Sequence, residues 1–473
     1  MLAYRVLLVT VLTVAGTAAN SVAWEWQMSA VIADGWQVPA NAPTSLQLDS
    51  QGRPHVATFS SMQGRIYCVW HDGVEWRASL VDTFGNSQSS LALDENETPW
   101  IACRHHESGD ADYLICTHFD GDAWHPDTID EVSAGYFYVS LALDGNDRPH
   151  ISYHLYDALP EHYTQLKYAV HDGASWATEV VDEGYAGYQN VGIYNALALD
   201  AGDHPHISYW GLGGHLTYAH HNGSAWELTT VDPVDSGRGT SIALDAEGHP
   251  HIIHTGPWLV GLRHSYFTGT TWQTEILDPD VNTGSHSTLA IDAAGRLHIS
   301  YWNSNLNGSF DELVYGCRES GVWTFETIDY DADGIASIQV GRHASIALDS
   351  EGRPRISYSR DGALWYALAA DAADADQRGG TANRVWLASH PNPFDRSTCI
   401  RFELAGAGPA ALRIVACDGR LVRTLAPDLA YRGTGRRTWD GCDSRGVPVP
   451  AGVYYAVVQQ GGQLSRCALL RVR

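Results

Sequence analysis

The stretch SLALDGNDRPHISY, Ser140 to Tyr153, decides the fold, because close variants of it occur seven times along the chain. Its aspartate recurs at Asp49, Asp94, Asp144, Asp200, Asp245, Asp292 and Asp349, so successive repeats are 45, 50, 56, 45, 47 and 57 residues apart. In each repeat an apolar run, a Gly/Pro turn and a second run rich in β-branched and aromatic residues indicate two strands joined by a tight hairpin. A variable segment, a third such run, a short turn and a run beginning at Trp follow. Each repeat therefore predicts four strands.

The two ends of the repeat array predict how it closes. The first six repeats carry a turn followed by Trp, at Gly73/Trp76, Gly121/Trp124, Gly173/Trp176, Gly223/Trp226, Gly269/Trp272 and Gly321/Trp323, whereas the seventh stops near Ala367 without this unit. A run from Trp24 through Trp26 to Ile32-Ala33-Asp34 can supply the missing fourth strand. We therefore predict an all-β chain with a seven-bladed β-propeller over residues 24–367, closed by an N-terminal strand that leaves no open sheet edge.

The N-terminus predicts export. Arg5 precedes an apolar run, Val6 to Ala15, and small residues end at Ser21-Val22-Ala23, which is the layout of a secretory signal peptide over residues 1–23. The run is too short for the roughly 20 residues that a membrane span needs, and no later segment is long and apolar enough. We expect a secreted or outer-surface protein with no membrane span after cleavage.

Composition and charge indicate a folded protein and argue against some classes of binding partner. The 473 residues include 44% hydrophobic residues, 17 Trp and 23 Tyr, as in a folded protein, and the net charge is −26. That balance argues against nucleic acid as a partner, because a phosphate backbone needs Lys and Arg. From Val385 onward 12 Arg face 6 Asp and Glu, a charge of +6, so the remainder carries −32. This asymmetry predicts a second domain over residues 385–473, after a linker over 368–384 rich in Ala, Asp and Gly.

The predicted export makes disulfide bonds among the eight cysteines possible, because disulfides persist outside the cytoplasm. Cys399, Cys417, Cys442 and Cys467 lie in the C-terminal region and can form two bridges, with three alternative connectivities. Cys103 and Cys116 are expected on adjacent strands, roughly opposite one another. No CxxC pair occurs, which argues against a zinc site of that type.

The repeated histidine is interpreted as part of the scaffold. Six residues after each repeat aspartate stand His55, Trp100, His150, His206, His251, His298 and Arg355. Equivalent positions of adjacent blades belong to sheets about 10 Å apart, far beyond the reach of a shared metal ion. Each imidazole is expected to satisfy the aspartate or backbone of its own turn, and each repeated Trp is expected to wedge between blades.

Loop lengths predict which face carries function. The turns between the first and second and the third and fourth strands of each repeat are nearly constant, whereas the other connections vary, and sites are commonly built on variable loops. Aromatic residues mixed with Asn, His and Arg suit an amphipathic ligand such as a sugar. The predicted ligand-binding residues are Arg104, His105, His154, Tyr156, Tyr188, Tyr194, Trp210, His215, Trp258, Trp302 and Asn303; His106, Tyr136, Tyr138 and Tyr185 lie in the same loops. For any one of them, simple packing of the loop is the alternative.

One segment offers a candidate calcium loop. Asp329-Tyr-Asp331-Ala-Asp333-Gly334 matches the start of a DxDxDG motif, although Val340 stands where the twelfth-position Glu is expected. Asp329 is also the aspartate that recurs at the end of the fourth strand of each repeat. A calcium ion here is expected to order a loop rather than to catalyse a reaction.

The repeats resemble the BNR/Asp-box-like propellers, which include sialidases and non-catalytic relatives, over residues 24–367. The strict SxDxGxTW motif is replaced by DxxGxPH, and an FRIP-like stretch is absent from the sequence. Nothing pairs Arg104, Arg238, Arg342 and Arg360 into an arginine triad. A glycosidase needs two carboxylates at a set separation, and no spacing singles out a pair among Glu107, Asp157, Glu161, Asp311 and Glu312. A sialidase-like hydrolase is therefore the alternative to a binding protein.

The C-terminal region resembles the FlgD-type Ig-like domain shared by C-terminal sorting domains of type IX (Por) secretion. The motifs are HPNPF from His390, LRIVACDGRLVRTL, TWDGCDSRG and PAGVYYAVV. The resemblance implies a small β-sandwich and, as a partner, outer-membrane secretion machinery. We expect an exported protein whose propeller binds a glycan or other surface polymer; a purely structural surface protein is a third interpretation.

Overall fold

The structure is a computed structural model, and it divides the chain into two compact units. One unit is Trp26–Ala369, and the other contains the strands from Trp386 onward. The residues that the structure describes are 24–33, 36–40, 43–61, 63–83, 85–107, 111–132, 137–157, 163–185, 190–256, 260–281, 287–304, 311–330, 340–370, 386–390, 394, 396–404, 410–416, 420–426, 433–460 and 463–472. The predicted signal peptide and linker lie outside these residues, apart from three linker residues, 368–370.

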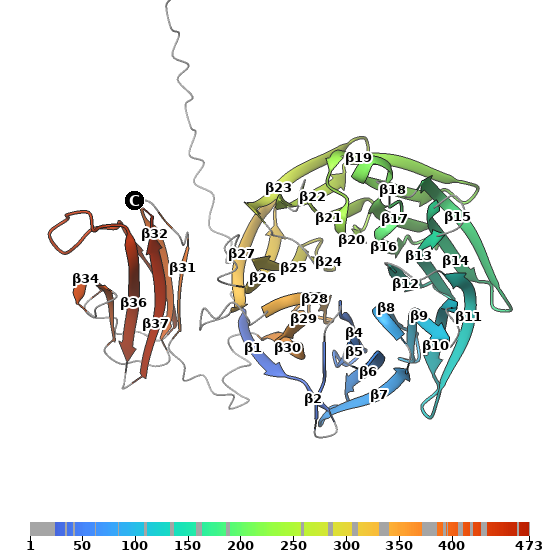
Figure 1. The fold of residues 1–473 in the computed structure, drawn as a ribbon, viewed down its shortest axis with the longest axis horizontal. Helices are drawn as coiled ribbons and strands as arrows, with labels where there is room; N and C mark the ends of the chain where they lie inside the picture. The colour runs from blue at the N-terminus through green and yellow to red at the C-terminus, as the bar shows by residue number, and fades with distance from the viewer. Residues whose placement is uncertain are drawn as a thin grey trace, which may run out of the picture. The chain divides into compact units, whose positions relative to one another are not determined.

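The Trp26–Ala369 unit is a propeller-like arrangement of mainly antiparallel sheets, most of them built from one stretch of chain (Figure 1). We number the sheets one to seven in chain order. Their strands are β4 (Ser45–Leu48), β5 (Pro54–Ser60), β6 (Arg65–His71) and β7 (Trp76–Asp82); β8 (Gly85–Leu93), β9 (Pro99–Glu107), β10 (Ala111–Phe119) and β11 (Trp124–Val132); β12 (Val139–Leu143), β13 (Pro149–Asp157), β14 (Tyr163–His171) and β15 (Trp176–Tyr185); β16 (Ile193–Leu199), β17 (Pro205–Trp210), β18 (His215–His221) and β19 (Trp226–Asp235); β20 (Arg238–Leu244), β21 (Pro250–Thr255), β22 (Val260–Phe267) and β23 (Trp272–Val281); β24 (Thr288–Ile291), β25 (Leu297–Ser304), β26 (Asp311–Glu319) and β27 (Val322–Tyr330); β28 (Val340–Leu348), β29 (Pro354–Arg360) and β30 (Ala363–Ala370). The first strand of each sheet lies nearest the common centre (Figure 1).

The N-terminal segment contributes to two sheets. Strand β1 (Glu25–Ala30) is hydrogen-bonded to β30, as fourth strand of sheet seven. The next two strands, β2 (Ile32–Ala33) and β3 (Trp36–Gln37), extend sheet one, where Ala33 pairs with Trp76 of β7. One strand continuing to Asp34 was expected, but β1 ends at Ala30. The buried Val31 marks the change of sheet, and its N–H donates to the Leu364 carbonyl at 2.9 Å.

Tryptophans at the start of fourth strands pack against the preceding sheet. Trp226 meets Tyr168 of sheet three edge to face, with ring centroids 5.3 Å apart, and its Nε1 donates to Glu179 at 2.9 Å. Trp26 of β1 does the same on sheet six, at 5.2 Å from Tyr315, with its Nε1 2.8 Å from Glu326. Burying these large rings between sheets is a strong apolar contribution to their packing.

The repeat turn satisfies its own polar groups. In repeat three, Asp144 accepts hydrogen bonds from the N–H groups of Asn146 and Arg148 at 2.8 and 2.9 Å, and Arg148 Nε donates to its other oxygen at 2.6 Å. In repeat six, Nδ1 of the buried His298 bonds the Tyr315 hydroxyl at 2.7 Å, while its Nε2 lies 3.4 Å from the turn aspartate. Burial lowers the pKa of His298. The histidine thus joins its turn to the third strand of the sheet, as part of the scaffold.

The aspartate at the end of a fourth strand links one sheet to the next. Asp182 accepts a hydrogen bond from Tyr209 of the following sheet at 2.7 Å, and Asp130 accepts one from Tyr153 at 2.6 Å. The Tyr209 hydroxyl lies in a buried side chain, so its hydrogen bond replaces lost contact with water. These bonds fix the packing of neighbouring sheets.

Cys103 and Cys116 lie on adjacent paired strands, as expected, but they are not opposite one another. Cys103 lies opposite Ile115, and Cys116 lies opposite Ala102. Because side chains alternate across a strand, this offset of one residue puts the two thiols on opposite faces of the sheet and in different clusters. In the C-terminal unit Cys442 and Cys467 are also free thiols, so two bridges among its four cysteines do not form.

The C-terminal unit contains two sheets around one core. The first has the order β31 (Trp386–His390), β32 (Thr398–Leu404), β35 (Gly433–Trp439), and the second has the order β34 (Leu421–Ala426), β33 (Ala410–Ala416), β36 (Gly452–Gln460), β37 (Gln463–Arg471). Trp439 is fully buried between Phe394, 5.3 Å away, and Tyr454, 5.2 Å away. One aromatic residue from each of the NPF, WDG and GVYY motifs, Phe394, Trp439 and Tyr454, therefore lies in one hydrophobic core. No helix in the described residues of either unit is long and apolar enough to cross a bilayer.

Candidate functional site

The two ends of the sheets differ in the regularity of their connections. Every turn between the first and second strands of sheets one to seven contains five residues. Turns between the third and fourth strands lie at the same end, which we call the turn face. At the other end, the loop face, connections range from two to nine residues. The loop face can therefore vary without disturbing the repeat.

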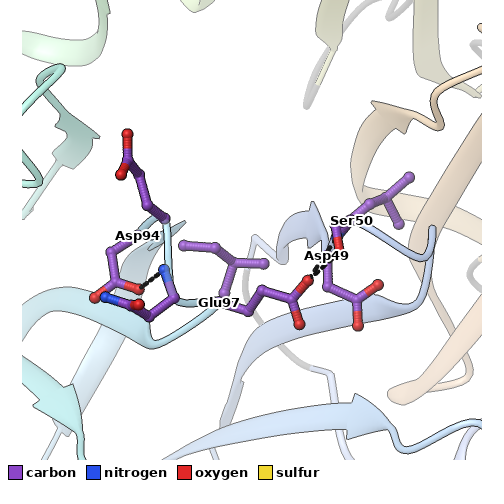
Figure 2. A pocket seen from close by; sticks show the side chains of 8 residues that line it. Asp49, Ser50, Asp94 and Glu97 are labelled. Carbon is purple, nitrogen blue, oxygen red and sulfur yellow. Dashed lines mark hydrogen bonds between the residues drawn. The ribbon is translucent and has the colours of Figure 1, made fainter.

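The turn face holds a hollow of about 350 Å³ between the turns of repeats one and two (Figure 2). Its polar groups bond one another: Glu97 accepts the Ser50 N–H at 3.0 Å. The same link joins the next turns, from the Glu95 N–H to Asp147 and from the Gly145 N–H to Asp203, at 3.0 and 3.1 Å. Because the hollow lies within this repeated network, we assign it to the scaffold.

On the loop face, three aromatic residues and one arginine form a continuous row across sheets three to five. The ring centroids of Tyr138 and Tyr194 are 4.7 Å apart. Tyr194 stacks on Trp210 at 5.8 Å with an interplanar angle of 17°, and the Arg238 guanidinium carbon lies 4.4 Å from the Trp210 ring centroid. All four side chains are partly exposed. We call this set the aromatic row.

A β-bulge positions the centre of the aromatic row. The pairing of β16 with β17 shifts between Ile193 and Ala196, and Tyr194 within the shift has φ of +57°, which is unusual for an aromatic residue. Thr240 donates to the Tyr194 carbonyl at 2.5 Å, and the Asn195 amide donates to the Tyr138 carbonyl at 3.2 Å. The backbone of the row is thereby held by side chains from two sheets.

A second arginine–tryptophan pair lies on sheets six and seven. The Arg342 guanidinium carbon is 4.3 Å from the ring centroid of Trp302, and its Nε is 3.9 Å from Asp311. A guanidinium over an indole is a favourable cation–π contact. The pair repeats the Trp210–Arg238 contact two sheets further along the chain.

One carboxyl near this second pair has an altered acidity. Glu312, opposite Asn303 in the pairing of β25 with β26, is partly buried, and the negative charge of Asp278 is near. Desolvation, followed by repulsion from Asp278, raises the pKa of Glu312 to about 7, against the lowering effect of a hydrogen bond with Asn303. A carboxyl with such a pKa can hold a proton near neutral pH.

The predicted residues of sheets two and three have partners within the protein. Arg104 is buried, with its Nε 3.7 Å from Asp112, and burial lowers its pKa. His105 Nδ1 lies 2.9 Å from Asp82. His154 is 3% exposed and meets Tyr138 edge to face at 6.4 Å, so it supports the aromatic row from below the surface. Tyr156 is partly exposed on β13.

The remaining predicted residues divide between the loop face and positions outside the described residues. His215 is partly exposed, with Nδ1 3.4 Å from the Val234 carbonyl. Tyr188, Trp258, Asp331 and Asp333 lie outside the described residues. Asp329 is buried and bonds Arg360 at 2.6 Å and Tyr358 at 2.8 Å. Protein donors thus engage Asp329, and the calcium prediction depends on Asp331 and Asp333, outside the described residues.

The sequence contained a signal for the arginine contacts that the predictions did not use. Arg238 and Arg342 each stand seven residues before a repeat aspartate, Asp245 and Asp349. Trp210 and Trp302 each stand ten residues after one. Aligning the repeats by these offsets would have placed each arginine beside the tryptophan of the preceding repeat.

Comparison with known proteins relates the chain to others in fold alone. No protein-family model matches it, and no curated protein matches it in sequence. Similar solved structures include the BP39L lectin of Burkholderia pseudomallei (10% identity, covering 70% of this chain and 98% of that one, TM-score 0.43) and the polysaccharide lyase Uly1 (10%, 72% and 92%, 0.44). PorZ, a surface component of the type-IX secretion system of Porphyromonas gingivalis, is also similar (11%, 91% and 74%, 0.30). These TM-scores carry no argument about function, so the two family resemblances stay predictions.

Proposed function

We propose that this chain is a secreted or cell-surface protein that binds a carbohydrate on its loop face. The aromatic row is the observation that carries the proposal. Partly exposed aromatic rings stack against the apolar faces of sugar rings, and Arg238 adds donors for hydroxyl or carboxylate groups. The bulge and the supporting Asn195 and Thr240 bonds hold the row in place before a ligand arrives, which lowers the entropic cost of binding.

The proposal includes the architecture predicted from sequence: a seven-bladed propeller closed by β1, a signal peptide over residues 1–23, and a FlgD-type Ig-like sorting domain over 385–473. The pairing of β1 with β30 supports closure. The shared core of the two C-terminal sheets supports a sandwich. By the resemblance, the partner of this domain is outer-membrane secretion machinery.

Glycan-array binding by the full chain and by Trp210→Ala tests the proposal. The wild-type protein is expected to bind a defined set of glycans, and the variant to lose at least about tenfold in affinity for them, because a stacked ring supplies over 1 kcal/mol. Trp70→Ala is the matched control, since Trp70 is a partly exposed tryptophan that lines a hollow on the turn face. Absence of glycan binding, or equal losses in both variants, contradicts the proposal.

Glu312 favours a second candidate function, glycoside hydrolysis. A carboxyl with a pKa near 7 is suited to act as a general acid. Asn303 lies opposite Glu312 on the neighbouring strand β25, and Trp302 is the residue next to Asn303. Turnover of fluorogenic glycosides by the wild type, lost in Glu312→Gln, would establish this activity. Glycan binding without turnover would leave the binding function alone.

A further inference from the structure

Repeats four and five both carry a histidine at a turn position that is an arginine in four other repeats. Four repeats have an arginine four residues after the turn aspartate, and its Nε donates to that aspartate at 2.5 to 2.8 Å; the pairs are Arg53–Asp49, Arg148–Asp144, Arg296–Asp292 and Arg353–Asp349. In repeat four this arginine is replaced by His204, whose Nδ1 lies 3.2 Å from Asp200, and in repeat five by His249, whose Nδ1 lies 3.4 Å from Asp245. The permanently charged guanidinium is thereby replaced by an imidazole, which can bind a metal ion.

The strand opposite this turn differs as well. His206 pairs with His220 on β18, whereas in repeat three His150 pairs with Val170. The rings of His206 and His220 have centroids 4.4 Å apart. One ligand atom from each of Asp200, His206 and His220 lies within 4.8 Å of the other two, a grouping found once among the described residues.

His206 shares its hydrogen bonding with the scaffold histidine His150, whose Nδ1 bonds Tyr168 and whose Nε2 lies 3.6 Å from Asp144, so the neighbouring His220 is what distinguishes repeat four from repeat three. The Nδ1 of His206 bonds the Tyr218 hydroxyl at 2.5 Å. Its Nε2 lies 3.7 Å from the Asp200 carboxylate and is buried with no hydrogen-bond partner among the described residues, in a residue that is 5% exposed. Histidines that bind metals commonly donate their other N–H to a fixed partner, which directs the second nitrogen at the ion.

We propose that Asp200, His206 and His220 bind one zinc ion on the turn face. Imidazole and carboxylate ligands suit zinc, whereas calcium and magnesium favour oxygen ligands throughout. Zinc–ligand bonds of about 2.0 to 2.2 Å require the ligand atoms to move together by about 1 Å, which side-chain rotation allows. The ion would link the turn that contains Asp200 to strand β18, which carries His220. This site is on the turn face, whereas the proposed carbohydrate site is on the loop face.

Zinc titration of the tag-free full chain, stripped of metal by a chelator, tests the proposal. One equivalent is expected to bind, and His220→Val, which copies Val170 of repeat three, is expected to weaken binding about 10- to 100-fold. His125→Ala is the control, because His125 and Asp120 form an exposed pair 2.6 Å apart that belongs to no group of three possible ligands among the described residues. No binding by the wild type, or unchanged binding by His220→Val, overturns the proposal.

A gain-of-site variant keeps the test independent of any folding defect in His220→Val. Arg148→His combined with Val170→His gives repeat three the side chains of repeat four. Two equivalents of zinc are expected, and cobalt substitution is expected to show twice the visible absorbance of the wild type. If the double variant unfolds like the wild type in chelator yet binds only one equivalent, this ligand set is insufficient and the proposal fails.

Discussion

The turn face and the loop face of the propeller-like unit are built from the same repeats but use their polar groups differently. On the turn face Asp144 bonds two backbone N–H groups and Arg148 of its own turn. On the loop face Tyr194 and Trp210 stack on one another and stay partly exposed. The difference teaches that one end of the repeat specifies the fold and the other end is free to acquire contacts with a ligand.

The largest expected effect is on the turn face. Asp144→Ala removes the acceptor of two backbone donors and leaves Arg148 without its partner, so the free energy of unfolding should fall by about 3 kcal/mol. Urea unfolding measures this change. Asp122→Ala, at an exposed position in a turn at the same end, should change it by less than about 0.5 kcal/mol. Equal losses of unfolding free energy in Asp144→Ala and Asp122→Ala would contradict the structural role given to Asp144.

A pH-dependent effect is expected on the loop face. Because the pKa of Glu312 is about 7 when folded and near 4.3 in an unfolded chain, the native state binds more protons between these values. Stability should therefore fall as pH rises through this window and stay lower above it. Glu312→Gln should be more stable than the wild type at pH 8, by roughly 1 to 3 kcal/mol, and equal to it at pH 4.

Urea unfolding at both pH values tests this expectation. Glu131→Gln, at an exposed carboxyl on β11, is the control and should show no difference between the two values. An advantage of Glu312→Gln that is the same at pH 4 and pH 8 would mean that the carboxyl charge is not its cause.

A smaller effect is expected between sheets. Tyr209→Phe removes the hydroxyl that bonds Asp182 at 2.7 Å and should cost about 1 to 2 kcal/mol of unfolding free energy, because the carboxylate loses a buried partner. Tyr156→Phe, on the partly exposed loop-face end of β13, should be near neutral. Thermal unfolding of both variants compares them, and a cost as large for Tyr156→Phe would contradict the role given to the Tyr–Asp link.

The smallest expected change in stability is at the arginine–tryptophan pair of the loop face. Arg342→Lys keeps the charge but loses the planar group over Trp302, so stability should fall by about 0.5 to 1 kcal/mol. Denaturant titration followed by tryptophan fluorescence measures it. A variant indistinguishable from the wild type would show that the stacking contributes no stability, and the pair would then be of interest only for binding.

The sequence predicted what is local and missed what depends on register or on contacts between sheets. Turn chemistry around Asp144 and the strand patterns are local, and they are found where expected. Cys103 and Cys116 were misplaced because a shift of one residue is invisible in an apolar run. The Trp210–Arg238 stack joins residues 28 apart on different sheets, so only an alignment of the repeats, and not a local pattern, could have pointed to it.

The N-terminal strand has a consequence for biosynthesis. Trp26 emerges from the ribosome early, yet its partner Glu326 follows 300 residues later. Until then the exposed rings of this segment have no place to pack, and a chain halted before β30 would present them to other molecules. In a rearranged chain that places Glu25–Ala30 directly after Ala370, β1 would follow its partner strand β30 in sequence. We expect this variant to refold faster than the wild type, because the contact between the two strands would no longer span most of the chain.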